Sequence, residues 1–128
     1  KNVVDFDNLN TRLLTKNEAN SWLKYDFKER KVKPTHYSIR LKPYGKNDHH
    51  PQSWVIEGSN DDNTWSTLDT RSGVTSLNAE SVVCTFEIQN PGNENDYYRY
   101  LKIRQTGKNA CGCDYLGFSS LEYFGSVI

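Results

Sequence analysis

Short runs in which apolar and polar residues alternate with a period of two restrict the fold of this chain most strongly. Leu23, Tyr25 and Phe27 alternate with Lys24 and Asp26. Successive side chains of a β-strand point to opposite faces, so this run predicts a strand with one buried face. Similar runs occur in residues 36–41, 53–57, 84–88, 98–104 and 121–123.

Turn-forming residues separate these runs. Residues 58–63 read Gly-Ser-Asn-Asp-Asp-Asn, and residues 90–93 read Asn-Pro-Gly-Asn. Pro34 precedes the second run, where its missing N–H costs a strand least. Residues 8–19 are a weak helix candidate interrupted by Asn and Thr, and we interpret them as a loop with at most one turn. The pattern predicts an all-β, antiparallel β-sandwich.

The length and composition are those of one folded domain. The chain has 128 residues, of which 35% are hydrophobic and 12% aromatic. A disordered chain would be poor in aromatic residues, and this length is typical of a single domain. We therefore expect one domain over residues 1–128. Its apolar runs are far shorter than the roughly 20 residues that cross a bilayer.

The charges and cysteines bear on partners and compartment. Sixteen basic and sixteen acidic residues balance to a net charge of zero, which argues against a nucleic-acid partner. Cys84, Cys111 and Cys113 are odd in number and lie away from both termini. This usage favours a reducing, cytoplasmic location, with an extracellular one as the alternative.

Several segments resemble a known family of binding modules. They are residues 21–27 (SWLKYDF), 34–40 (PTHYSIR), 50–61 (HPQSWVIEGSND) with Trp65 after it, 98–107 (YRYLKIRQTG) and 121–125 (LEYFG). Together they resemble the coagulation factor 5/8 type C, or discoidin-like, domain over nearly the whole chain. The sequences of residues 34–40 and 104–107 are most similar to those of modules attached to cytoplasmic BTB-type scaffold proteins.

The resemblance implies a galactose-binding-like jelly roll with neighbouring termini and ligand loops at one end. It implies a non-catalytic module that binds a protein or glycan and forms part of a larger protein. Consistent with this, the sequence lacks the spacings of serine hydrolases, zinc proteases and phosphate-binding loops. We therefore expect that the chain is not an enzyme and requires no cofactor.

Two loops carry the candidate ligand-binding residues. His49 and His50 lie in residues 44–52, which correspond to a ligand-facing loop of sugar-binding relatives, and a neutral imidazole can hydrogen-bond hydroxyl groups. The alternative is that His50 caps the turn before Pro51 or packs on Trp54.

The second loop, residues 107–115, combines a cation, an amide, a carboxylate and an aromatic ring, a mixture that suits a polar ligand. Its candidates, with one residue of the preceding strand, are Arg104, Lys108, Asn109, Asp114 and Tyr115. The alternative is a solvated connector between strands, because loops are commonly polar without binding anything.

The resemblance also implies a structural calcium or sodium site in some relatives. Its counterparts here are Asp5, Asp7, Thr11 and Glu122, with Asn10 nearby, and oxygen ligands suit a hard cation. The chain departs from the family pattern, because Phe6 replaces a glycine and one extra residue precedes Thr11.

A zinc site at Cys111 and Cys113 is disfavoured. A structural zinc ion needs four ligands, and Cys84 falls on a predicted buried strand face. Trp22, Trp54 and Trp65 are expected to fill the core rather than to stack on sugars, because two lie in predicted strands and one just after a turn.

The sequence thus predicts a recognition module whose loops near residues 12–21, 44–52 and 107–115 form a shallow polar site. For a protein partner, an exposed face of the sandwich is a second docking surface. The alternative function is binding to phospholipid or a membrane surface, for which Leu13 and Leu14, beside Arg12 and Lys16, are the candidate apolar tip. We expect no membrane binding, because the other loops lack such tips.

Overall fold

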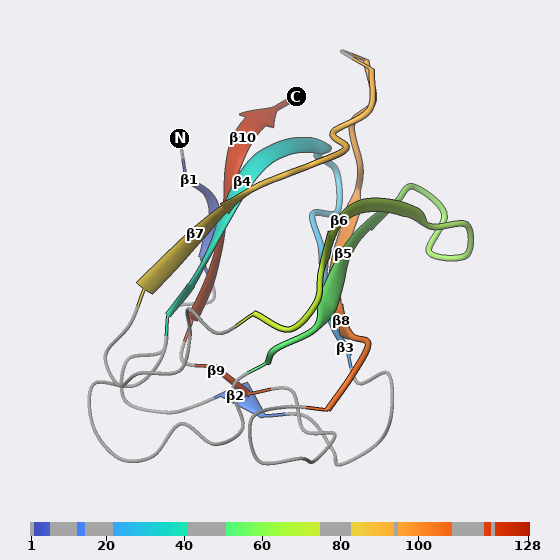
Figure 1. Ribbon diagram of the computed structural model, residues 1–128. Coiled ribbons are helices and arrows are strands. Elements are labelled where there is room, and N and C mark those ends of the chain that lie inside the picture. The colour runs from blue at the N-terminus through green and yellow to red at the C-terminus, as the bar shows by residue number, and fades with distance from the viewer. Residues whose placement is uncertain are drawn as a thin grey trace.

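The protein folds as a β-sandwich (Figure 1). The computed structural model describes residues 2–5, 13–14, 22–40, 51–74, 83–93, 95–108, 117–118 and 120–128, and these contain strands but no helix. The strands are β1 (Asn2–Asp5), β2 (Leu13–Leu14), β3 (Trp22–Asp26), β4 (Val32–Arg40), β5 (Trp54–Ser59), β6 (Ser66–Arg71), β7 (Val83–Glu87), β8 (Tyr100–Gln105), β9 (Gly117–Phe118) and β10 (Ser120–Val127).

Two antiparallel sheets form the layers of the sandwich. The first has the order β1-β10-β4-β7 and the second β3-β8-β5-β6, while β2 and β9 pair as a short ribbon. Most neighbours are distant in sequence, as Figure 1 shows for β4 between β10 and β7, whereas β5 and β6 are consecutive strands joined by a turn. The predicted all-β, antiparallel sandwich is confirmed.

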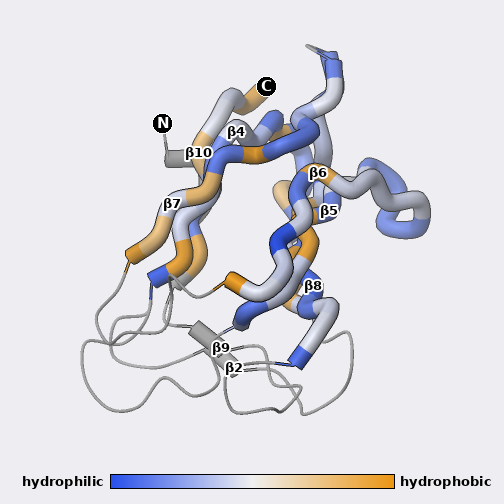
Figure 2. The backbone as a smooth tube through the Cα atoms, viewed as in Figure 1, coloured by the Kyte–Doolittle hydropathy of each residue, from blue (hydrophilic) through white to orange (hydrophobic). Residues whose placement is uncertain are grey.

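The core lies between the sheets and follows the period-two pattern. In β8, Leu101 and Ile103 are fully buried, whereas Lys102 and Arg104 are only partly buried. Figure 2 shows hydrophobic residues along the strands and a hydrophilic turn between β5 and β6. The buried cluster comprises Val32, Tyr37, Ile39, Trp54, Ile56, Leu68, Ile88, Tyr98, Leu101, Ile103, Leu121 and Tyr123.

A polar network crosses this core. The Trp54 Nε1–H donates to the Tyr37 hydroxyl at 2.8 Å, and that hydroxyl donates to Asp69. Asp69 also accepts from Arg71 Nε at 2.9 Å and from the backbone N–H of Gln89 at 3.1 Å. Its side chain has no exposed surface, so these donors replace the water that a buried carboxylate loses.

Two local predictions were wrong. Pro34 was expected before a strand, but it lies inside β4. There it pairs with Gly125 at a β-bulge of β10. Because β7 pairs with β4 only from His36 onward, no β7 residue needs the N–H that proline lacks. In the weak helix candidate, Leu13–Leu14 forms a strand, and the rest of residues 8–19 lies outside the described residues.

The terminal strands are neighbours. β1 pairs with β10, and Asn2 lies opposite Phe124. The marked ends of the chain accordingly lie at the same end of the sandwich in Figure 1, as the resemblance implies. Within the described part of the chain, no helix has the length and apolarity to span a membrane.

Candidate functional site: an aromatic and cationic sheet face

The β3-β8-β5-β6 sheet turns a face away from the core, here called the outer face. Arg104 lies opposite both Trp22 and Val55, Lys102 opposite Lys24 and Glu57, and Tyr100 opposite Asp26 and Ser59. Side chains directly opposite one another on antiparallel strands are neighbours on one face. On β3, β5 and β8 the outer face therefore comprises Trp22, Lys24, Asp26, Val55, Glu57, Ser59, Tyr100, Lys102 and Arg104.

Trp22 is the most exposed aromatic side chain of this face. It is 51% exposed, and its ring centre lies 5.4 Å from Lys24 Nζ and 5.7 Å from Lys102 Nζ. An ammonium group within about 6 Å of an indole is attracted to its electron-rich face. The prediction that all three tryptophans fill the core is wrong for Trp22, although Trp54 is fully buried.

Trp65 contacts the same face from the turn before β6. Lys102 Nζ lies 4.0 Å from the centre of its ring, and the Tyr100 ring centre is 6.4 Å away. Trp65 is only partly buried and belongs neither to the core cluster nor to the residues packed against it, so the core prediction fails for this residue too. Lys102 thus lies between Trp22 and Trp65, close to both rings.

Glu57 holds the cations of the outer face in position. Its side chain is only 10% exposed, and Oε1 accepts a hydrogen bond from Arg104 Nε at 3.1 Å. A second Arg104 nitrogen lies 3.4 Å from Oε2, and Lys102 Nζ lies 3.6 Å from Oε1. One recessed carboxylate therefore fixes two cations beside Trp22.

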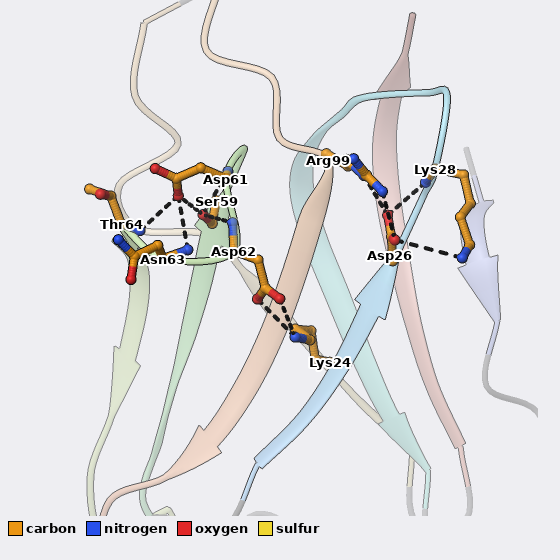
Figure 3. Close-up of polar contacts among 9 residues, drawn as sticks. All are labelled: Lys24, Asp26, Lys28, Ser59, Asp61, Asp62, Asn63, Thr64 and Arg99. Carbon is orange, nitrogen blue, oxygen red and sulfur yellow. Dashed lines mark hydrogen bonds and ion pairs between the residues drawn. The ribbon is translucent and has the colours of Figure 1, made fainter.

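Two further carboxylates hold the cations at the edges (Figure 3). Both oxygens of Asp62 accept from Lys24 Nζ at 2.8 Å. Asp26 accepts from Arg99 at 2.8 and 3.0 Å, and Lys28 Nζ lies 3.8 Å away. The hydrogen bonds from Arg99 are the main reason that the pKa of Asp26 falls to about 2. The face keeps these charges at neutral pH.

Of the predicted ligand-binding residues, the structure describes Arg104 and Lys108. Arg104 lies directly opposite Trp22 on the outer face, and Lys108 is exposed beyond the end of β8. The others, His49, His50, Asn109, Asp114 and Tyr115, lie outside the described residues and stay predictions. Trp22 was missed, although the alternation of Leu23, Tyr25 and Phe27 already implied that it faces outward.

The predicted cation site is described only in part. Asp5 of β1 lies opposite Glu122 of β10, so the register brings two of the four predicted ligands together. Asp7 and Thr11 lie outside the described residues. Among the residues described, no three His, Cys, Asp or Glu side chains are close enough to hold a metal ion. The calcium site stays a prediction, and Cys111 and Cys113 are likewise not described.

The sequence matches no protein-family model. Over 130 residues it is 29% identical to the E3 ubiquitin-protein ligase Ufd4 of Drosophila melanogaster. That similarity covers 100% of this chain but only 5% of the ligase. Neither this protein nor the structures below is named as a BTB protein, so that part of the resemblance stays a prediction.

Solved structures with a similar fold include carbohydrate-binding modules of family 32 (CBM32). One, from Clostridium perfringens, is in complex with GalNAc-β-1,3-galactose; it has a TM-score of 0.68 and 12% identity, over 91% of this chain and 76% of that one. The module of AlyQ, in complex with 4,5-unsaturated mannuronic acid, has a TM-score of 0.66 and 15% identity, over 93% and 81%.

A third module, CBM32-3 from a family 31 glycoside hydrolase of Clostridium perfringens, has a TM-score of 0.66 and 11% identity. The superposition covers 90% of that module and 98% of this chain. At these identities the likeness concerns the fold. The chain has the galactose-binding-like, or discoidin-like, β-sandwich fold of these carbohydrate-binding modules.

Proposed function

We propose that the chain is a non-catalytic carbohydrate-recognition module in which a sugar ring stacks on Trp22. The observation that carries this proposal is the half-exposed indole on a sheet face whose other side chains are mostly charged. The exposed apolar surface of a large aromatic residue is in contact with water, and a ligand that covers this surface gains the free energy of its burial. The apolar face of a pyranose is such a ligand.

The groups around Trp22 suit the rim of a sugar. Its hydroxyls can accept hydrogen bonds from Lys24 and Lys102, whose ammonium groups flank the indole. Because Glu57 already orients Lys102, less side-chain entropy is lost when the ligand binds. Small-ligand sites commonly combine an apolar surface with a few oriented polar groups, as this face does.

The predicted loops extend the same site. Residues 12–21 end immediately before Trp22, and residues 107–115 begin two residues after β8 ends. His49, His50, Asn109, Asp114 and Tyr115 remain proposed contacts for sugar hydroxyls. The named complexes of the structural neighbours with GalNAc-β-1,3-galactose and 4,5-unsaturated mannuronic acid support a glycan ligand.

A protein partner is the second candidate, favoured by the similarity of the whole chain to a segment of a ubiquitin ligase. The two candidates differ in compartment. The cysteine count favours the cytoplasm, whereas the carbohydrate-binding neighbours favour the extracellular alternative. We therefore pair the glycan proposal with an extracellular protein, which fractionation of cells with an antibody to the chain would test.

A glycan array followed by calorimetric titration tests the proposal. We expect at least one neutral or acidic glycan to bind, Trp22→Ala to abolish binding and Trp22→Phe to retain part of it. The control is His36→Ala, an exposed residue of the other sheet, which should bind like the wild type. An array without hits for the wild type would refute the glycan function and favour the protein partner.

Vesicle sedimentation of the wild-type protein tests the alternative function, which is binding to a membrane surface. Leu13 and Leu14, its candidate tip, form β2, which pairs with β9. We expect no sedimentation with vesicles, whether or not they contain phosphatidylserine. Sedimentation that depends on phosphatidylserine would instead support the membrane function.

A further inference from the structure

The Lys102 ammonium group lies in a recess next to two indole rings. Its Nζ is 4.0 Å from the centre of the Trp65 ring and 5.7 Å from that of Trp22. The Lys102 side chain is only 15% exposed, so most of it is shielded from water. Both rings keep accessible surface, 51% of it in Trp22 and a smaller fraction in Trp65. The outer face therefore presents two aromatic surfaces with a recessed ammonium group beside both.

The N–H donors of this ammonium group have no hydrogen-bond acceptor in the part of the chain that the structure describes. The ion pair of Lys102 with Glu57 spans 3.6 Å, which is longer than a hydrogen bond. Its other two contacts are with the faces of indole rings. Lys24 differs, because its Nζ donates to both carboxylate oxygens of Asp62 at 2.8 Å. Lys102 is thus the lysine of this pair that can still donate fully to the oxygens of a ligand.

The turn that carries Trp65 is fixed before any ligand binds. Asp61 accepts hydrogen bonds from two backbone N–H groups of this turn, at 2.9 and 2.7 Å (Figure 3). The next residue, Asp62, pairs with Lys24 of β3, on the far side of β8 (Figure 3). A ligand that contacts Trp65 therefore loses little binding free energy in ordering the turn.

The two rings are close enough to contact one ligand. Because both distances are measured from the same Lys102 atom, the ring centres of Trp22 and Trp65 lie at most 9.7 Å apart, the sum of 5.7 and 4.0 Å. A di- or trisaccharide spans such a distance. Its sugars are joined through an oxygen and carry hydroxyl groups beside it, and these oxygens are acceptors for an ammonium group.

We propose that the site takes a linear oligosaccharide, with one sugar stacked on Trp22, another against the exposed part of Trp65, and Lys102 donating hydrogen bonds to oxygens beside the linkage. Trp65 then determines specificity, because it favours chains over single sugars. This inference rests on the proposed function and specifies the size of its ligand. The acceptors are neutral oxygens, so neutral sugars are the appropriate probes.

Ligands that differ only in length test this inference. Galactose, galactobiose and galactotriose form one series, N-acetylglucosamine, chitobiose and chitotriose a second, and mannose, mannobiose and mannotriose a third. In calorimetric titrations, we expect the series that binds best to gain about tenfold in affinity with length, the effect of one hydrogen bond to a charged group. A longer ligand offers more than one ring to Trp22, so a gain no larger than its number of rings is statistical and would contradict the second contact.

Two variants assign the gain to residues. Trp65→Ala removes the second ring, and Lys102→Met removes the donors while keeping a long unbranched side chain. Each should reduce the ratio of oligosaccharide to monosaccharide affinity to its statistical value, whereas Trp65→Phe should keep part of the gain. The control is Phe124→Ala, which truncates a partly buried aromatic residue of the other sheet and should keep the full ratio. Urea denaturation shows whether each variant is folded.

Each outcome separates this inference from the proposed function. Equal affinity for short and long sugars, with loss of both in Trp22→Ala, refutes the second contact and leaves carbohydrate recognition standing. A gain that survives in folded Trp65→Ala and Lys102→Met also refutes it, because the additional contacts then lie elsewhere. Binding of a branched glycan on the array without binding of any linear series has the same consequence. No binding of any sugar by the wild type refutes both proposals.

Discussion

Tyr37 and Asp69 belong to different sheets, and the Tyr37 hydroxyl donates a hydrogen bond to Asp69 across the interior, with an O···O distance of 2.5 Å. Burial and the neighbouring carboxylate both raise the pKa of Tyr37 well above its ordinary value. Tyr37 therefore remains a hydrogen-bond donor throughout the pH range in which the protein is handled. The contact links β4 to β6 at the point where both sheets contribute to the core.

Removal of the Asp69 carboxylate should destabilise the fold strongly. Asp69→Ala leaves the Tyr37 hydroxyl and the Gln89 N–H without their acceptor and deprives Arg71 of its counter-charge. Breaking a buried charge pair in this way costs about 3 kcal/mol. Urea denaturation should show a lower midpoint with an unchanged slope. A change below about 1 kcal/mol would contradict the role assigned to this network.

Stability should fall in acid because two carboxylates resist protonation in the folded state. Hydrogen bonds from Arg99 lower the pKa of Asp26 to about 2, and backbone hydrogen bonds from Thr64 and Asn63 lower that of Asp61 to about 2, both from an ordinary 3.8. The unfolded chain therefore binds more protons between pH 3.8 and about 2. This stabilisation is complete above pH 3.8 and disappears as the pH falls through 2.

The acid effect is measured as the free energy of unfolding between pH 5 and 2, which should decline for the wild type. Asp26→Asn and Asp61→Asn should each be less stable than the wild type at pH 5 and show a shallower decline. The control is Glu29→Gln, at an exposed carboxylate outside the turn that contains Asp61, which should decline like the wild type. A decline as steep in Asp61→Asn as in the wild type would show that Asp61 contributes nothing to acid stability.

Gly58 should tolerate no side chain. A Cβ atom there would lie 2.7 Å from Cγ of Tyr98, whose ring is mostly buried in the core cluster. Gly58→Ala should therefore cost about 1–3 kcal/mol through overpacking. Gly73 provides the comparison, because nothing lies within 4 Å of a Cβ atom there, although its φ of +58° strains any other residue. Thermal denaturation should show a greater loss for Gly58→Ala than for Gly73→Ala.

Truncation should destabilise the protein far more at Trp54 than at Trp22. Trp54 has no exposed surface and donates to Tyr37, so Trp54→Ala should cost about 3–5 kcal/mol. Trp22 is 51% exposed, so Trp22→Ala should change the free energy of unfolding by less than about 1 kcal/mol. Chemical denaturation of both variants measures the difference. A large loss in Trp22→Ala would assign this residue to the core and remove the basis of the proposed site.

The fold was predictable from strands such as β8, in which buried and more exposed residues alternate, although all six residues of β5 are buried. The alternation of Leu101 and Ile103 with Lys102 and Arg104 appears in the structure as the inner and outer faces of β8. The same alternation implies that Trp22 faces outward with Lys24. That implication was overridden by the general tendency of tryptophan to be buried, which is weaker than strand geometry.

Other features depend on contacts that no local pattern contains. A bulge between Ile56 and Glu57 shifts the pairing of β5 with β6, and Leu68 and Asp69, adjacent in the chain, are both buried. A period of two allows only one of them to face the core. The position of Trp65 over Lys102 likewise joins residues 37 positions apart, and sequence spacing does not predict such a contact.

The pairing of β1 with β10 also determines how the module can be tethered. Trp22 begins β3 at one end of the sandwich, and the two marked chain ends lie at the other end (Figure 1). A host protein, a surface or a second copy fused at either end would therefore leave the outer face unobstructed. Copies linked in series could all present Trp22 to one polymer, and their weak individual affinities would then combine into avidity.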